Sequence, residues 1–172
     1  YTTLFRSGEE VYISMVNKAE KYCWFMTPYL IITDEMSHAL CLAAKRGVDV
    51  RIITPGIPDK KMIYNITRSF YHGLVKHGVH IYEWTPGFCH AKMSVADDCM
   101  ATCGTINLDY RSLYHHFENG CFMADCQAVL DIRNDLAATM DECREVTEQY
   151  STGRSAYLRL GQLFMRLFAG LL

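Results

Sequence analysis

The chain has 172 residues, of which 50% are hydrophobic and 12% aromatic, and its formal net charge at pH 7 is −2. This composition supplies the core of one ordinary domain and excludes a disordered or low-complexity chain. No uncharged apolar run reaches the roughly 18 residues that a membrane-spanning helix needs, and the charge lacks the basic excess typical of nucleic-acid-binding proteins.

Apolar periodicity predicts helices that alternate with strands along the chain. Helices are expected over 9–22, 34–46, 62–76 and 127–139, and strands over 23–26, 48–54, 79–83, 93–96, 99–103 and 120–124. The alternation predicts an α/β fold with a central, largely buried sheet and helices on both faces. Pro28, Pro55 and Pro86 each follow a strand. We therefore expect their loops at one edge of the sheet, where open α/β sheets bind ligands.

One stretch combines chemically active residues in the pattern H-x-K-x4-D-x6-G-T-x-N, which runs from His90 to Asn107. Alternate residues of a strand share a face, so His90 and Lys92 are expected on one side, about 6–7 Å apart. A neutral imidazole is suited to attack phosphorus, and an ammonium to neutralise the non-bridging phosphate oxygens. The run Gly104-Thr105-Ile106-Asn107 offers a tight turn and an amide donor for the same oxygens.

Asp97 completes this pattern and is counted with the candidate catalytic residues. It is expected at the turn between the two strands of the motif, next to Asp98. That position lies beyond the strand that carries His90. It favours a role in holding the hairpin over contact with a substrate.

The pattern resembles the signature of the phospholipase D superfamily, called the HKD motif. Over about 10–172 the chain is similar to the C-terminal half of bacterial cardiolipin synthases, notably in 27–30, 43–56, 78–88 and 107–120. The resemblance implies that 1–172 is a single phospholipase D-like domain with a mixed sheet. It also implies that the one motif is the second of two, with the N-terminal half and a membrane anchor absent. Departures at Cys89, Ser94 and Gly170 do not touch the reacting groups.

The resemblance assigns roles to particular residues. His90, Lys92, Asp97 and Glu118 are the expected catalytic group, in which Glu118 accepts a hydrogen bond from the His90 ring and orients it. Lys92, Thr105 and Asn107 are expected to bind the substrate phosphate. No metal and no cofactor are implied.

The implied activity is that of a phosphatidyltransferase that joins two phosphatidylglycerol molecules into cardiolipin and releases glycerol, through a phosphohistidine intermediate. Its expected partners are phosphatidylglycerol, cardiolipin, a membrane surface and the N-terminal HKD half, and no nucleic acid is expected. We expect it at the cell membrane, with the catalytic domain on the cytoplasmic side. The alternative is a single-motif hydrolase or endonuclease that acts as a homodimer. A binding module without turnover is disfavoured because the motif is complete.

The cysteines and the C-terminal tail give two further expectations. The thiols of Cys23, Cys41, Cys103 and Cys121 fall inside apolar patterns and are expected to be buried in a reducing compartment. A zinc site from Cys99, Cys103, His115 and His116 is disfavoured because the spacing matches no zinc motif. The tail over 154–172 has the pattern of a basic amphipathic helix, for which docking on the rest of the protein is favoured over membrane binding.

Overall fold

A seven-stranded mixed sheet forms the centre of the structure, a computed structural model that describes residues 7–151. Its strand order is β8-β6-β5-β1-β3-β4-β9. β1, β3 and β4 run parallel, and the remaining neighbours pair antiparallel. The strands of this sheet are β1 (Tyr22–Met26), β3 (Asp49–Pro55), β4 (His80–Trp84), β5 (Met93–Ala96), β6 (Met100–Gly104), β8 (Gly120–Ala124) and β9 (Cys143–Glu145).

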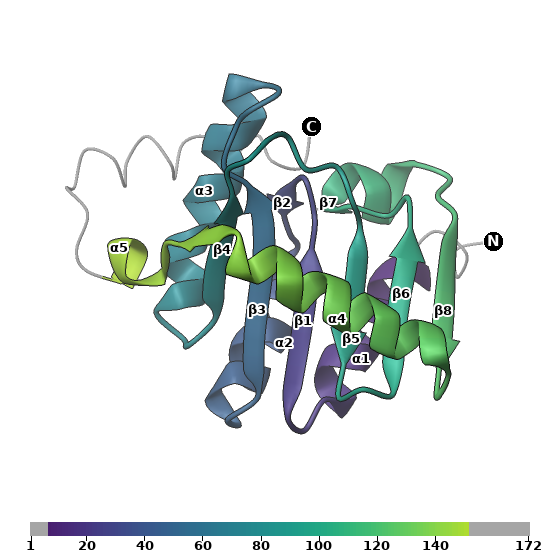
Figure 1. The fold of residues 1–172 in the computed structure, drawn as a ribbon. Helices are drawn as coiled ribbons and strands as arrows, with labels where there is room; N and C mark the ends of the chain where they lie inside the picture. The colour runs from purple at the N-terminus through teal and green to yellow at the C-terminus, as the bar shows by residue number, and fades with distance from the viewer. Residues whose placement is uncertain (1–6, 152–172) are drawn as a thin grey trace.

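Helices cover both faces of this sheet, as the alternating pattern predicted (Figure 1). The long helix α4 (Gln127–Asp141) crosses one face, and α1 (Ser7–Lys18), α2 (Asp34–Lys45) and α3 (Lys61–Val75) pack on the other. Shorter elements complete the described chain: β2 (Leu30–Ile31), β7 (Leu108–Asp109), the π-helix η1 (Arg111–His115) and α5 (Thr147–Ser151). Among residues 7–151, no helix has the length and apolar content needed to span a membrane.

Two apolar clusters hold these layers together. The larger packs α1, α2 and α3 against the sheet through side chains such as Met15, Leu40 and Phe25, all buried. The smaller packs Val129 and Leu136 of α4 against the opposite face. Burial on both faces is clearest at β1, whose five residues are all apolar and are buried or half-buried.

Many strand ends of the central sheet meet at one edge. β1, β3 and β4 end there, because they are parallel. β5 begins there, since Met93 pairs with Met26 at the end of β1. Gly104 at the end of β6 pairs with Gly120 at the start of β8. The loops after β1, β3, β4 and β6 and the segments before β5 and β8 therefore share this edge. It lies at the top of Figure 1, and we call it the site edge.

Several boundaries differ from the sequence expectations. The first helix ends at Lys18 rather than residue 22, because the next backbone N–H groups bind a side chain of the β5–β6 turn. His90 and Lys92 lie in an extended segment before β5 and not in a strand, since the partner strand β1 ends at Met26. The strands β2, β7 and β9 and the π-helix were not predicted.

The expectation of four buried thiols was wrong for two of them. Cys103 and Cys121 are exposed, because they lie near the end of β6 and on the edge strand β8. Cys23 is buried, as expected, whereas Cys41 is only half-buried. The predicted helix over 154–172 lies outside the described residues.

Candidate active site

His90 and Lys92 form a close pair at the site edge. Lys92 Nζ lies 2.9 Å from His90 Nδ1 and donates to the His90 backbone oxygen at 2.8 Å. The extended backbone is fixed by a hydrogen bond from Gly104 N to Lys92 O. Alternate residues therefore do share a side, as predicted. The two side chains bring a nucleophilic nitrogen and a cation to one point.

The electrostatic setting of Lys92 combines burial with nearby carboxylates. Burial lowers the pKa of its ammonium, while the charges of Glu118 and Asp109 act in the opposite direction. Asp109 is 8% exposed and accepts a hydrogen bond from Ser112 N. Its own burial raises its pKa. Asp109 lies two residues after the motif, and sequence reasoning missed it as a partner of the lysine.

Glu118 lies on the β8 side of the site and is held by Thr105. Thr105 Oγ1 donates to the Glu118 carboxylate and accepts from Asn119 N, and Thr105 N donates to Asn119 O. The expected hydrogen bond from His90 to Glu118 is not among those made by residues 7–151. The hydroxyl expected to bind phosphate is therefore engaged with the carboxylate expected to orient the histidine.

Sterics explain why the motif has glycine at position 104. A Cβ atom on Gly104 would stand 2.3 Å from Asn119 O and 2.7 Å from Gly120 Cα, closer than any side chain tolerates. The close approach of these two backbones sets Thr105 opposite Glu118. This part of the motif builds the site rather than reacting in it.

The Asn107 amide is only partly satisfied by the fold. Its Oδ1 is buried and has no hydrogen-bond partner within residues 7–151. Buried polar atoms are nearly always paired in proteins, and exceptions often mark functional groups or bound water. Asn107 therefore stays a candidate for phosphate binding.

Asp97 lies at the other end of β5 from His90 and is not brought to the site. Its carboxylate accepts three backbone hydrogen bonds, from Glu20 at 2.7 Å, Lys21 at 2.9 Å and Tyr22 at 2.8 Å. Its own backbone has a φ of +52°, in the left-handed region. Asp97 thus ties the β5–β6 turn to the loop between α1 and β1. Its geometry favours the structural role over the catalytic one.

Aromatic rings border the imidazole. Tyr29 meets the His90 ring edge-on with centroids 6.4 Å apart, and the Phe88 ring lies 5.8 Å away. Thr27 fixes the loop of Tyr29, because its hydroxyl donates to Tyr29 O and accepts from Leu108 N. Sequence reasoning did not assign Tyr29 to the site, although its place directly after a strand marked the correct edge.

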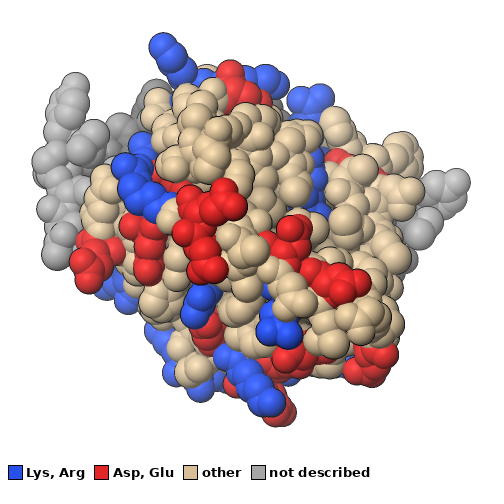
Figure 2. Space-filling view, viewed as in Figure 1, with Lys and Arg blue, Asp and Glu red and all other residues tan. Residues whose placement is uncertain are grey.

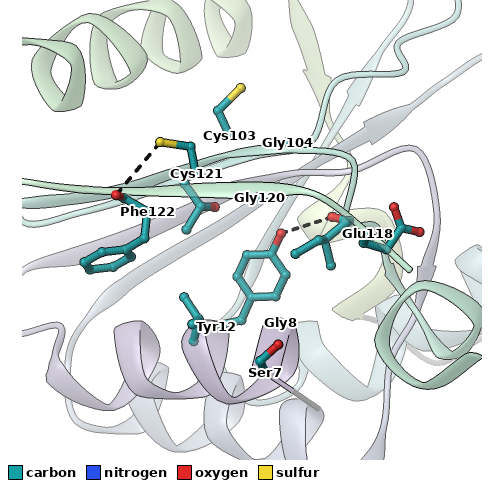
Figure 3. A pocket seen from close by; sticks show the side chains of 12 residues that line it. Ser7, Gly8, Tyr12, Cys103, Gly104, Glu118, Gly120, Cys121 and Phe122 are labelled. Carbon is teal, nitrogen blue, oxygen red and sulfur yellow. Dashed lines mark hydrogen bonds between the residues drawn. The ribbon is translucent and has the colours of Figure 1, made fainter. Parts of the chain in front are cut away.

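A cavity of about 210 Å³ opens beside Glu118, between α1 and the β6–β8 pair (Figure 3). Tyr12 rises from α1 into it and donates to Ile106 O at 3.0 Å. This hydrogen bond holds the turn that carries Thr105 and Asn107. Among residues 7–151 there is no cluster of three or more metal-ligating side chains.

Comparison with known proteins identifies the family of this site. Residues 12–140 match the family model described as the PLD-like domain of cardiolipin synthase. The chain belongs to this phospholipase D family. The chain is 32% identical to a cardiolipin synthase of Halalkalibacterium halodurans over 170 residues, which are 99% of this chain and 34% of that protein. It is 34% identical to cardiolipin synthase 2 of Bacillus cereus, over 95% of this chain and 32% of that protein.

A more similar relative carries no functional name. An uncharacterised protein of Streptococcus mutans is 49% identical over 96% of this chain and 36% of its own length. The phospholipase D family domain described here thus spans about a third of the length of its relatives.

Solved structures show the same fold at low sequence identity. Phosphatidylserine synthase of Haemophilus influenzae superimposes with a TM-score of 0.73 at 17% identity, covering 96% of this chain and 44% of that one. Nuc, a phospholipase D family member of Salmonella typhimurium, gives 0.71 at 17%, covering 81% of this chain and 91% of that one. The mixed sheet with helices on both faces is therefore the phospholipase D fold, as expected.

Proposed function

We propose that this domain supplies one His–Lys pair of a cardiolipin synthase, which transfers a phosphatidyl group between two phosphatidylglycerol molecules and releases glycerol. The observation that carries the proposal is the contact between Lys92 Nζ and His90 Nδ1 at the site edge. The membership in the cardiolipin synthase family supports the choice of substrate.

The chemistry runs in two balanced steps. A histidine nitrogen attacks phosphorus of the donor lipid, the bond from phosphorus to the glycerol oxygen breaks, and a second histidine protonates that oxygen. The second histidine then takes the proton of the acceptor hydroxyl, which attacks phosphorus and breaks the bond to nitrogen. His90 takes one of these two roles. Lys92 and Asn107 stabilise charge on the phosphoryl oxygens.

The proposal requires a second motif. The two steps use two histidines, and the H-x-K-x4-D pattern occurs once in this chain. We propose that the partner is the N-terminal HKD half of the same protein, so that this domain is the C-terminal half. The coverage of about a third of each relative supports such a division.

The exposed side chains of the site edge suit a lipid substrate. Ile57 and Met62 follow β3 and are 45% and 56% exposed, and Phe88 beside His90 is 41% exposed. Lys60 and Lys61 are exposed between them. Apolar side chains flanked by lysines favour an anionic membrane surface. We therefore propose that this edge faces the membrane, with the domain on its cytoplasmic side.

A nuclease is the competing function, in which two copies of a single-motif chain would complete one site. Nucleic-acid binding depends on a basic surface that neutralises phosphates. On the face seen in Figure 2, acidic and basic side chains are intermixed, and the whole chain has a net charge of −2. The charge pattern favours the lipid substrate.

The test is an assay of the full-length protein on phosphatidylglycerol in mixed micelles, with cardiolipin and glycerol measured together. The proposal expects both products in equal amounts and their loss in His90→Ala. Cleavage of DNA by a homodimer of this domain, without turnover of lipid, would replace the proposal by the nuclease.

A further inference from the structure

Two exposed cysteines face each other across the last two strands of the sheet. Cys103 on β6 and Cys121 on β8 are direct register partners, and both are free thiols. Directly opposed residues of an antiparallel pair project from the same face. Figure 3 shows both sulfur atoms on the side of the strands that faces away from Tyr12.

The register gives the spacing of this pair. Thr105 N donates to Asn119 O at 2.8 Å, and Asp125 N donates to Cys99 O at 2.9 Å, so these are hydrogen-bonded pairs. Hydrogen-bonded pairs recur at every second residue, which makes Cys103 and Cys121 another. Cα atoms in such a pair lie about 5.5 Å apart, within the range of about 4.4–6.8 Å that disulfides span.

The same register makes a disulfide here strained. Cβ atoms of a hydrogen-bonded pair lie about 5.5 Å apart, whereas a relaxed disulfide holds them at about 3.8 Å. The strands must therefore shift to close the bond. β8 is an edge strand with one free side, so it is able to move. Strained and exposed disulfides are readily reduced, and they serve as reversible bonds rather than permanent ones.

We propose that Cys103 and Cys121 form a dithiol modification site that closes reversibly to a cross-strand disulfide by exchange with a low-molecular-weight disulfide. One thiolate attacks the small disulfide and expels a thiolate. The second cysteine then attacks the mixed disulfide and expels the other. Two protein thiols and one small disulfide yield one protein disulfide and two small thiols. The inference does not depend on the proposed function.

Formation of the disulfide displaces backbone that leads directly into the candidate site. Gly104 follows Cys103 and Gly120 precedes Cys121, and the backbones at these glycines already touch. The contact between Thr105 and Glu118 comes directly after this point. A shift of β8 toward β6 is therefore passed to the residues opposite Lys92.

The test is to equilibrate the full-length protein with mixtures of oxidised and reduced glutathione, alkylate the free thiols and digest with trypsin without reduction. The expected product links peptide 93–111 to peptide 112–133, and reduced glutathione in excess removes the link. These peptides also contain Cys99 and Cys126. The double variant Cys99→Ser/Cys126→Ser must therefore keep the link, and Cys103→Ser and Cys121→Ser must each lose it.

Other outcomes overturn the proposal. Mixed glutathione adducts without a linked peptide mean that the two thiols do not reach each other. Loss of the link in the double variant assigns it to other cysteines. A link that persists in excess reduced glutathione is a permanent staple, and a covalent dimer on a non-reducing gel is a bond between molecules.

Discussion

Lys92 Nζ lies 2.9 Å from His90 Nδ1 and 3.3 Å from His90 Nε2, so the cation of the motif is within hydrogen-bond distance of both ring nitrogens. An ammonium only donates hydrogen bonds and therefore contacts an imidazole through the lone pair of a ring nitrogen. A phosphate entering the site would compete for the same ammonium. In the proposed mechanism, Lys92 would exchange its contact with the imidazole for one with the substrate oxygens.

Replacement of the histidine tests this arrangement. We expect His90→Ala in the full-length protein to lower cardiolipin formation by at least about 10²–10⁴-fold, the contribution of one positioned acid, base or nucleophile. His38→Ala is the matched control, because His38 is exposed on α2, which contributes no residue to the candidate site. Equal rates for the two variants in the micelle assay would show that His90 takes no part in the reaction.

The pH dependence tests the role of Lys92. Burial lowers its pKa, so the folded protein loses this proton at a lower pH than an exposed lysine does. If the charged form stabilises the phosphoryl group, activity falls on the alkaline side, beginning below the ordinary lysine pKa. Arginine keeps its charge at higher pH than lysine does. Lys92→Arg should therefore shift the alkaline fall in activity to higher pH, even at a reduced maximum rate. If the alkaline fall in activity stays at the same pH in Lys92→Arg, a group other than Lys92 causes it.

Removal of Asp97 separates stability from catalysis. Asp97→Ala loses three hydrogen bonds to a carboxylate, and we expect the free energy of unfolding to fall by about 2–4 kcal/mol. Glu20→Ala is the control, since it keeps the backbone donor and removes only an exposed side chain. It should change stability by no more than about 0.5 kcal/mol. Urea titration gives both values.

The same variant decides how Asp97 contributes to activity. We expect the rate per folded molecule to be nearly unchanged in Asp97→Ala. A loss comparable to that of His90→Ala in fully folded protein would show that the aspartate acts in the chemistry after all.

Binding to vesicles tests the membrane-facing edge. We expect the double variant Ile57→Asp/Met62→Asp to sediment less with phosphatidylglycerol vesicles, because two exposed apolar side chains become charged. Leu42→Asp is the matched control, since Leu42 is 43% exposed but lies on α2. Equal losses for both variants would mean a general effect of acidic charge. Retained binding in His90→Ala would separate docking from catalysis.

Much of the fold followed from local pattern. The central strands and the four long helices were predicted within a few residues, because strand burial and helical periodicity are local signals. Pro28 after β1, Pro55 at the end of β3 and Pro86 after β4 marked the site edge correctly, since parallel strands end together. The motif spacing alone placed His90 and Lys92 on one side of the chain.

The tertiary structure decided which residues of the pattern meet. Asp97 is five positions from Lys92 in sequence, yet its carboxylate binds the loop before β1, a contact between distant segments that spacing does not encode. Glu118 reaches the site only because β8 pairs with β6, and there it meets Thr105. Cys103 and Cys121 look like core residues in sequence, but the position of β8 at the sheet edge exposes them. Local sequence thus determined the elements and the close approach of His90 and Lys92. Strand order determined their neighbours, because pairing partners are chosen by packing across the whole chain.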